Sequence, residues 1–186
     1  MPVKPSVHTI KVSLRHMKPP IWRRLQVPAK TSLAQLHHII QAAMGWDDCH
    51  LHQFEVRELC YAAPEHELDD TRDESRRTLA TLPVGERFSY WYDFGDDWHH
   101  DILVESIDQA DPALTYPRCV TGRRACPPED SGGPGGFAEL MRALGDQNHP
   151  QRARCHELIP VDYDPTHFDL NEINDALAHL DVALSA

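Results

Sequence analysis

The segment over residues 87–105 constrains the fold most, because it has the period of a β-strand on both sides of one turn. In "RFSYWYD" the side chains of Phe88, Tyr90 and Tyr92 alternate with outward-facing residues, and the alternation resumes in "WHHDILVES". A period of two residues predicts half-buried strands, and the intervening "FGDD" is typical of a tight turn. The segment therefore predicts an antiparallel hairpin.

The rest of the chain supplies strands first and helices last. Residues 8–14, 21–27 and 50–56 alternate like strands, and Arg23 falls on the apolar face of the second. Apolar spacing predicts a helix over residues 32–44 that ends at Gly45, and further helices that begin near Gly136 and Asp169. This order predicts an α+β protein with a mostly antiparallel sheet, one helix inserted after the first two strands, and packed C-terminal helices.

The chain length favours one domain over residues 1–186, because 186 residues suffice for one substantial core and are few for two. Two segments break the periodic pattern. Residues 62–77 are acidic and predict a mobile surface loop, whereas residues 111–136 are rich in proline and glycine and predict a long irregular loop.

Charge and composition limit the class of protein. The net charge of −11 opposes a general role in coating nucleic acid. No apolar run approaches the roughly 18 residues that span a membrane, and the N-terminal segment lacks the apolar core of a signal peptide. The sequence thus predicts a cytoplasmic protein without membrane contact, in which the five cysteines are thiols.

The stretch "YWYDFGDDWHH" and the neighbouring "HLH" supply side chains that could bind a metal. The proposed ligands are His50, His52, Asp93, Asp96 and His100. Imidazole and carboxylate groups suit zinc or manganese, and histidines two residues apart on a strand point the same way. The alternative is a structural turn in which Gly95 has a positive φ, Asp93 and Asp96 cap backbone amides, and His52 bonds to Asp93. The sequence leaves both interpretations open.

A second candidate site is the loop "GRRACPPEDSGGPGG". Its amides could form an anion-binding nest with Arg123 and Arg124, or the loop could be a rigid connection capped by Glu129 and Asp130. The same two acids are candidate general bases for a metal-dependent hydrolase. The order of residues excludes a Walker-type phosphate loop, and Cys126 alone is weak support for a thiol enzyme.

Basic residues mark a third candidate site on the first two strands. Arg15, Lys18, Arg23 and Arg24 surround Trp22, a mixture that can bind single-stranded nucleic acid. The alternative is that these arginines pair with nearby acids.

Five motifs occur in order along nearly the whole chain: "IWRRLQVP", "LHHIIQAAMGWDDCHLHQF", "YWYDFGDDWHHDILVE", "CPPEDSGGPGGF" and "FDLNEINDAL". With them the chain resembles the plasmid pRiA4b ORF-3-like family. The resemblance implies a single α+β unit of bacterial or archaeal origin, in some cases carried by plasmids or insertion elements. It implies no catalytic residues and no established role.

No complete catalytic constellation can be assembled from spacing. We therefore expect a non-enzymatic binding or accessory module that contacts a protein partner through a groove between the sheet and the C-terminal helices, with no certain cofactor. A metal-dependent hydrolase that uses the His/Asp set with zinc or manganese is one alternative. A nucleic-acid-binding accessory protein of mobile elements is the other.

Overall fold

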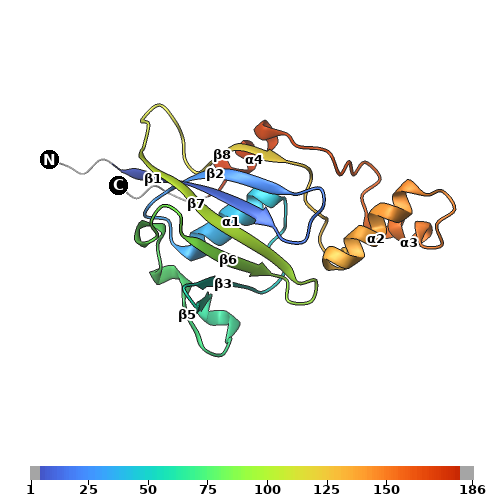
Figure 1. Ribbon diagram of the computed structural model, residues 1–186, viewed down its shortest axis with the longest axis horizontal. Coiled ribbons are helices and arrows are strands. Elements are labelled where there is room, and N and C mark those ends of the chain that lie inside the picture. The colour runs from blue at the N-terminus through green and yellow to red at the C-terminus, as the bar shows by residue number, and fades with distance from the viewer. Residues whose placement is uncertain (1–4, 181–186) are drawn as a thin grey trace.

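The computed structural model describes residues 5–180 and contains one eight-stranded, mostly antiparallel sheet with four α-helices (Figure 1). The strands are β1 (Ser6–Leu14), β2 (Trp22–Pro28), β3 (His52–Val56), β4 (Leu59–Ala62), β5 (Thr71–Asp73), β6 (Arg87–Tyr92), β7 (Trp98–Gln109) and β8 (Arg118–Arg123). The helices are α1 (Leu33–Met44), α2 (Gly133–Gly145), α3 (Arg152–Leu158) and α4 (Leu170–Ala178). The predicted α+β class is confirmed.

The strand order across the sheet is β5-β4-β3-β6-β7-β1-β2-β8. All neighbours are antiparallel except β4 and β5, which are parallel. The predicted hairpin is β6 and β7, with Tyr90 opposite His100. The predicted antiparallel pair of the first two strands is β1 and β2.

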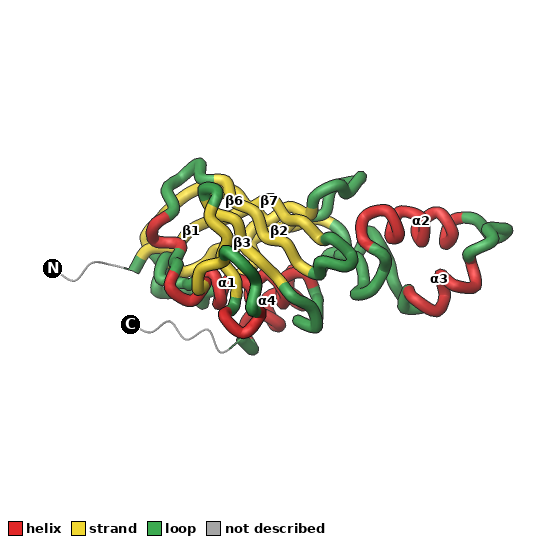
Figure 2. The backbone as a smooth tube through the Cα atoms, turned by 90° about the horizontal axis from the view of Figure 1, so that it is seen from below, coloured by secondary structure: helices red, strands yellow, loops and turns green. Residues whose placement is uncertain are grey.

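The core lies between the sheet and helices α1 and α4, which lie on the same side of the sheet (Figure 2). Its largest fully buried side chains include Trp98, Tyr90, Tyr92 and Phe54. Helix α1 begins at the cap Ser32, which forms a reciprocal capping box with Gln35, and ends at Gly45 with φ 79°. The helix predicted over 32–44 is thus confirmed to within one residue.

Helices α2 and α3 form a lobe beyond one end of the sheet (Figures 1 and 2). The ring of Phe137 on α2 lies edge-on to the ring of Tyr163, and the thiol of Cys155 on α3 lies 3.4 Å from the carbonyl oxygen of Leu140 on α2. No helix in the described part of the chain is long and apolar enough to cross a membrane.

The two segments predicted as loops contain regular structure. Residues 62–77 include β5 and two short 3-10 helices, η1 (Pro64–His66) and η2 (Glu74–Arg76). The side chain of Glu74 is buried and bonded to His52. This burial was not predicted, because the segment has no periodic spacing of apolar residues. The prediction over 111–136 missed strand β8, which pairs with β2.

The free edge of β8 is covered by α4. The Asn174 side-chain amide accepts a hydrogen bond from the Cys119 backbone N–H at 2.7 Å and donates to the Cys119 carbonyl oxygen at 3.1 Å. An amide side chain thereby takes the place of the next strand at this residue.

Replacement of Gly122 by alanine is expected to lower the free energy of unfolding by about 2 kcal/mol, because overpacking of a close contact typically costs that much. A Cβ atom at Gly122 would lie 2.5 Å from Phe168 Cε2 and 2.7 Å from the Trp22 carbonyl oxygen. Gly145→Ala is the matched control, since a Cβ there meets nothing within 4 Å. If both variants unfold at the same urea concentration, the close contacts of Gly122 with Phe168 and Trp22 are not tight enough to exclude a methyl group.

Candidate metal centre

The turn between β6 and β7 fixes the orientation of Asp93. Its Oδ1 accepts hydrogen bonds from the backbone N–H groups of Gly95, at 3.0 Å, and Asp96, at 3.2 Å. The positive φ angles in this turn belong to Asp93 and Asp97, so the prediction that Gly95 supplies one is wrong. Because Oδ1 is held by amides, Oδ2 is left to face other groups.

Four side chains converge beside this turn, and we call them the His50 cluster: His50, Asp93, Glu129 and Asp130. His50 Nε2 lies 3.6 Å from Asp93 Oδ2, 3.3 Å from Asp130 Oδ1 and 3.9 Å from Glu129 Oε2. The ligand atoms of His50, Asp93 and Asp130 all lie within 4.8 Å of one another. Three carboxylates therefore surround one imidazole nitrogen.

Two atoms of the cluster are buried without a hydrogen-bond partner among the described residues, namely His50 Nε2 and Glu129 Oε2. A buried polar atom left unpaired costs about 1–3 kcal/mol, and more for a charged group. Two ligands that each lie about 2.1 Å from one tetrahedral ion are about 3.4 Å apart. The distances of 3.3 and 3.6 Å from His50 Nε2 to Asp130 and Asp93 are close to that value, whereas Glu129 lies farther away at 3.9 Å.

Neighbouring groups orient Glu129. The Tyr92 hydroxyl donates to Glu129 Oε1 at 2.9 Å, and the Asp47 backbone N–H donates to the same oxygen at 3.0 Å. Burial raises the pKa of Tyr92, and the hydrogen bond to Glu129 raises it further, so Tyr92 stays a neutral donor. Trp46 Nε1 fixes the same loop by donating to the Pro127 carbonyl oxygen at 2.8 Å.

Of the five predicted ligands, the structure brings only His50 and Asp93 together. Asp96 Oδ2 instead accepts from the Gly132 N–H at 2.9 Å and holds the loop before α2. His100 is fully buried, with Nδ1 3.3 Å from the Tyr90 carbonyl oxygen, and burial lowers its pKa to about 3. The remaining members of the cluster, Glu129 and Asp130, were predicted as bases or anion-binding residues.

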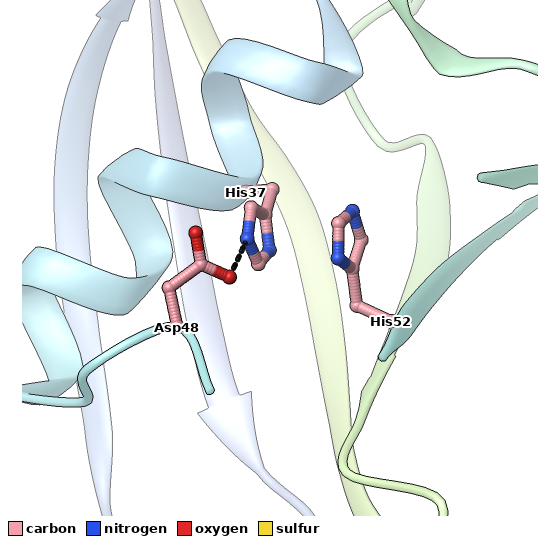
Figure 3. Close-up of side chains that lie close together, drawn as sticks. All are labelled: His37, Asp48 and His52. Carbon is pink, nitrogen blue, oxygen red and sulfur yellow. Dashed lines mark hydrogen bonds and ion pairs between the residues drawn. The ribbon is translucent and has the colours of Figure 1, made fainter. Parts of the chain in front are cut away.

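The fifth predicted ligand, His52, belongs to a separate histidine group with His37 and Asp48 (Figure 3). The predicted bond between His52 and Asp93 is wrong, because His52 Nε2 bonds to the two carboxylate oxygens of Glu74 at 3.0 and 3.2 Å. The rings of His37 and His52 are stacked, with centroids 3.5 Å apart and planes 7° apart.

Hydrogen bonds assign the tautomer of His37. The Tyr90 hydroxyl oxygen accepts from Gln41 Nε2 at 2.9 Å, so its proton is free to be donated to His37 Nδ1 at 2.7 Å. His37 Nε2 then carries the ring proton and donates to Asp48 Oδ1 at 2.6 Å. Burial, followed by the charge of His52, lowers the pKa of His37 to about 2. Neither nitrogen is left for a metal, so this group is structural.

Sequence reasoning missed His37, although a signal was present. His37 lies one turn after Leu33, next to Leu36 on the stripe of apolar residues of α1, and it is 2% exposed. A histidine on such a stripe must be buried and needs partners for both ring nitrogens.

The basic residues of the first two strands are largely neutralised or buried. Arg15 pairs with Asp101, and Arg24 pairs with Glu105 through two hydrogen bonds. Arg23 is 4% exposed, so it cannot contact nucleic acid at the surface. The alternative prediction, that arginines here pair with nearby acids, is confirmed for Arg15 and Arg24.

The glycine-rich loop shows little of an anion site. Its Gly132 amide is already bonded to Asp96, while Arg123 is exposed and Arg124 is half-buried. Cys126 is buried, and burial raises the pKa of its thiol, which argues against a reactive thiolate.

Comparison with known proteins relates the chain as a whole to one family. The model of the plasmid pRiA4b ORF-3-like protein family matches residues 6–172. The uncharacterized protein y4hQ of Sinorhizobium fredii is 36% identical over 180 residues, which cover 94% of this chain and 92% of that protein. The crystal structure of a protein of unknown function, MM3350 from Methanosarcina mazei Go1, is similar with a TM-score of 0.85 and 34% identity over 91% of this chain and 98% of that one.

Proposed function

We propose that this chain, which belongs to the plasmid pRiA4b ORF-3-like family, is a binding module whose functional centre is a divalent metal held by the His50 cluster. The observation that supports the proposal is the convergence of three carboxylates on His50 Nε2. Within residues 5–180, neither His50 Nε2 nor Glu129 Oε2, 3.9 Å apart, forms a hydrogen bond, although both are buried. A cation would satisfy both atoms at once and offset the three negative charges around them.

The ligand set favours zinc or manganese. Carboxylate oxygens suit hard cations such as manganese, and imidazole suits zinc. The cluster is open on one side, because the side chain of Asp130 is 76% exposed and that of His50 is 28% exposed. A metal there would keep positions for water or for an oxygen ligand of a partner.

A metal-dependent hydrolase is the second candidate function, and the same open side favours it. Against it, Glu129 and Asp130, the predicted bases, lie where they would serve as ligands. Metal-dependent hydrolysis of p-nitrophenyl esters or phosphodiesters, lost in Asp93→Asn, would establish the hydrolase. Equal rates with and without metal would leave the binding module as the function.

Metal content by elemental mass spectrometry tests the proposal. Protein purified without chelator, or reconstituted with Zn²⁺ or Mn²⁺ and desalted, is expected to hold close to one equivalent of metal. Asp93→Asn is expected to lose it, because the substitution removes the charge of a ligand while keeping its shape. Asp97→Asn in the same turn is the matched control and is expected to retain the metal.

Absence of metal from the reconstituted parent, or equal content in the two variants, would overturn the proposal. A cytoplasmic location, a protein partner and an association with plasmids or insertion elements remain predictions of the same proposal. Nucleic-acid binding is disfavoured by the net charge of −11 and by the pairing of Arg15 and Arg24 with acids.

A further inference from the structure

A cavity of about 280 Å³ lies between the end of α1, helix α4 and the side chain of Arg23 on β2. We propose that this cavity binds a small aliphatic carboxylate, with the carboxylate group on Arg23. This site is separate from the His50 cluster, and none of its lining residues belongs to that cluster.

Arg23 carries a buried positive charge. Its side chain is on the apolar face of β2, is 4% exposed, and forms no ion pair with a carboxylate among the described residues. Charged residues are almost never fully buried unless they are paired. A bound anion would therefore stabilise the charge of Arg23, since no carboxylate of the described residues pairs with it.

The hydrogen bonds of Arg23 leave room for such an anion. Nε donates to the Ala43 carbonyl oxygen at 3.0 Å, and Nη1 donates to the carbonyl oxygens of Trp22 and Arg123 at 3.0 and 3.2 Å. Among the described residues, Nη2 has one hydrogen-bond partner, Cys126 Sγ at 3.3 Å, and sulfur is a weak acceptor. A guanidinium has five N–H groups, so at least one is available on Nη2 for a carboxylate oxygen.

The guanidinium is also held rigidly, as a binding group requires. The Phe168 ring lies over it, with the guanidinium carbon 5.2 Å from the ring centroid. Gly122 permits this stack, because a Cβ at that position would lie 2.5 Å from Phe168 Cε2 and 2.9 Å from Arg23 Cδ. A fixed guanidinium loses little entropy when it binds a ligand.

The rest of the cavity wall determines which chemical group can be attached to the carboxylate of the ligand. The apolar side chains that line it include Ala42, Ala43, Ile173 and Ala176. A volume of about 280 Å³ is at the small end of the range of ligand pockets, so a small molecule suits it. A short aliphatic chain fits this part of the wall.

The acids at the rim do not cancel the attraction. Glu172 is exposed and pairs with His167 at 2.8 Å, and Asp169 Oδ1 is occupied by the backbone N–H groups that begin α4. Arg23 is the buried charge, whereas the rim acids are screened by solvent. A carboxylate therefore gains most at the inner wall.

The test compares butyrate with butyramide, its neutral isostere, by calorimetry and by chemical-shift perturbation. Butyrate is expected to bind in the millimolar range, and butyramide at least about tenfold more weakly, because a charge-assisted hydrogen bond is lost. A peptide that ends in an aliphatic residue, added as the free acid and as the amide, distinguishes a peptide C-terminus from a free acid as the source of the carboxylate.

Variants are chosen to leave Arg23 in place, because Arg23 also holds the end of α1 through Ala43. Ala176→Phe fills the cavity from exposed helix surface and is expected to weaken butyrate binding at least tenfold. Ala178→Phe, two residues on and outside the cavity, is the matched control and should bind like the parent. Binding in Asp93→Asn is expected to be unchanged, which separates this site from the proposed metal centre.

Equal binding of butyrate and butyramide would overturn the proposal, since the charge of Arg23 would then play no part. No binding of butyrate to the folded parent, or unchanged binding by Ala176→Phe, would also overturn it.

Discussion

A His50→Ala variant is expected to bind Zn²⁺ or Mn²⁺ more than about 100-fold more weakly than the parent. Mutation of a residue that only hydrogen-bonds to a metal ligand typically costs about 10- to 100-fold in metal affinity, and loss of the ligand itself is expected to cost more. His50 Nε2 is the atom that the three carboxylates of the cluster share, at 3.3 to 3.9 Å. Without it, the remaining groups are carboxylates that repel one another. Isothermal titration of metal-free protein measures the change.

Tyr92→Phe provides a graded version of the same measurement. The Tyr92 hydroxyl donates to Glu129 Oε1 and is not itself a proposed ligand, so Tyr92 is a positioning residue. Its loss is expected to weaken metal binding about tenfold and to leave the stoichiometry at one. Tyr116→Phe removes a hydroxyl that accepts from the Asp111 N–H far from the cluster, and serves as the control. Parent-like affinity in both His50→Ala and Tyr92→Phe would exclude the cluster as the metal centre.

The free energy of unfolding is expected to fall more steeply with decreasing pH than protonation of the carboxylates alone would cause. Burial lowers the pKa of His37 to about 2 and of His100 to about 3, and burial also lowers the pKa of His8. Below pH 6.5 these residues take up protons in the unfolded chain and stay neutral in the folded one. Their contribution to stability is complete above pH 6.5 and is lost as pH falls from there towards the folded pKa.

The size of this effect follows from proton linkage. Each such histidine lowers the free energy of unfolding by up to about 1.4 kcal/mol per pH unit within its window. His100→Gln keeps a donor for the Tyr90 carbonyl oxygen but does not titrate, so its stability is expected to fall less steeply by about that slope. Urea unfolding at several pH values between 7.5 and about 5 measures it.

The control for this series is His156→Gln, which replaces a histidine on the exposed surface of α3. It should follow the parent at every pH. Parallel pH curves for His100→Gln and the parent would show that His100 does not bear the acid sensitivity.

Periodicity predicted those parts of the fold in which one face of an element is buried. The hairpin of β6 and β7, the capped helix α1, and the position of Arg23 on the apolar face of β2 all follow from spacing along the chain. Residues 62–77 have no such spacing, and the buried Glu74 among them is bonded to His52, which lies on a strand distant in the sequence. A contact across 22 residues leaves no local pattern.

The candidate site was predictable in part for the same reason. His50 and Asp93 lie next to strands whose pairing, His52 opposite Tyr92, brings them together. Asp130 and Glu129 come from an irregular loop, whose path depends on tertiary bonds such as the one from Trp46 to Pro127. The sequence therefore allowed the types of residue at the site to be predicted, but not which of these residues lie together in the folded chain.

The amide of Asn174 on the edge of β8 has a consequence for how copies of this protein meet. An open strand edge offers unpaired N–H and C=O groups to any other strand, and such edges seed aggregation and strand exchange. Asn174 occupies both groups of Cys119, and at the opposite edge β5 has only three residues, preceded by an acidic run. Each edge of the sheet therefore carries a feature that opposes pairing with a strand of another copy.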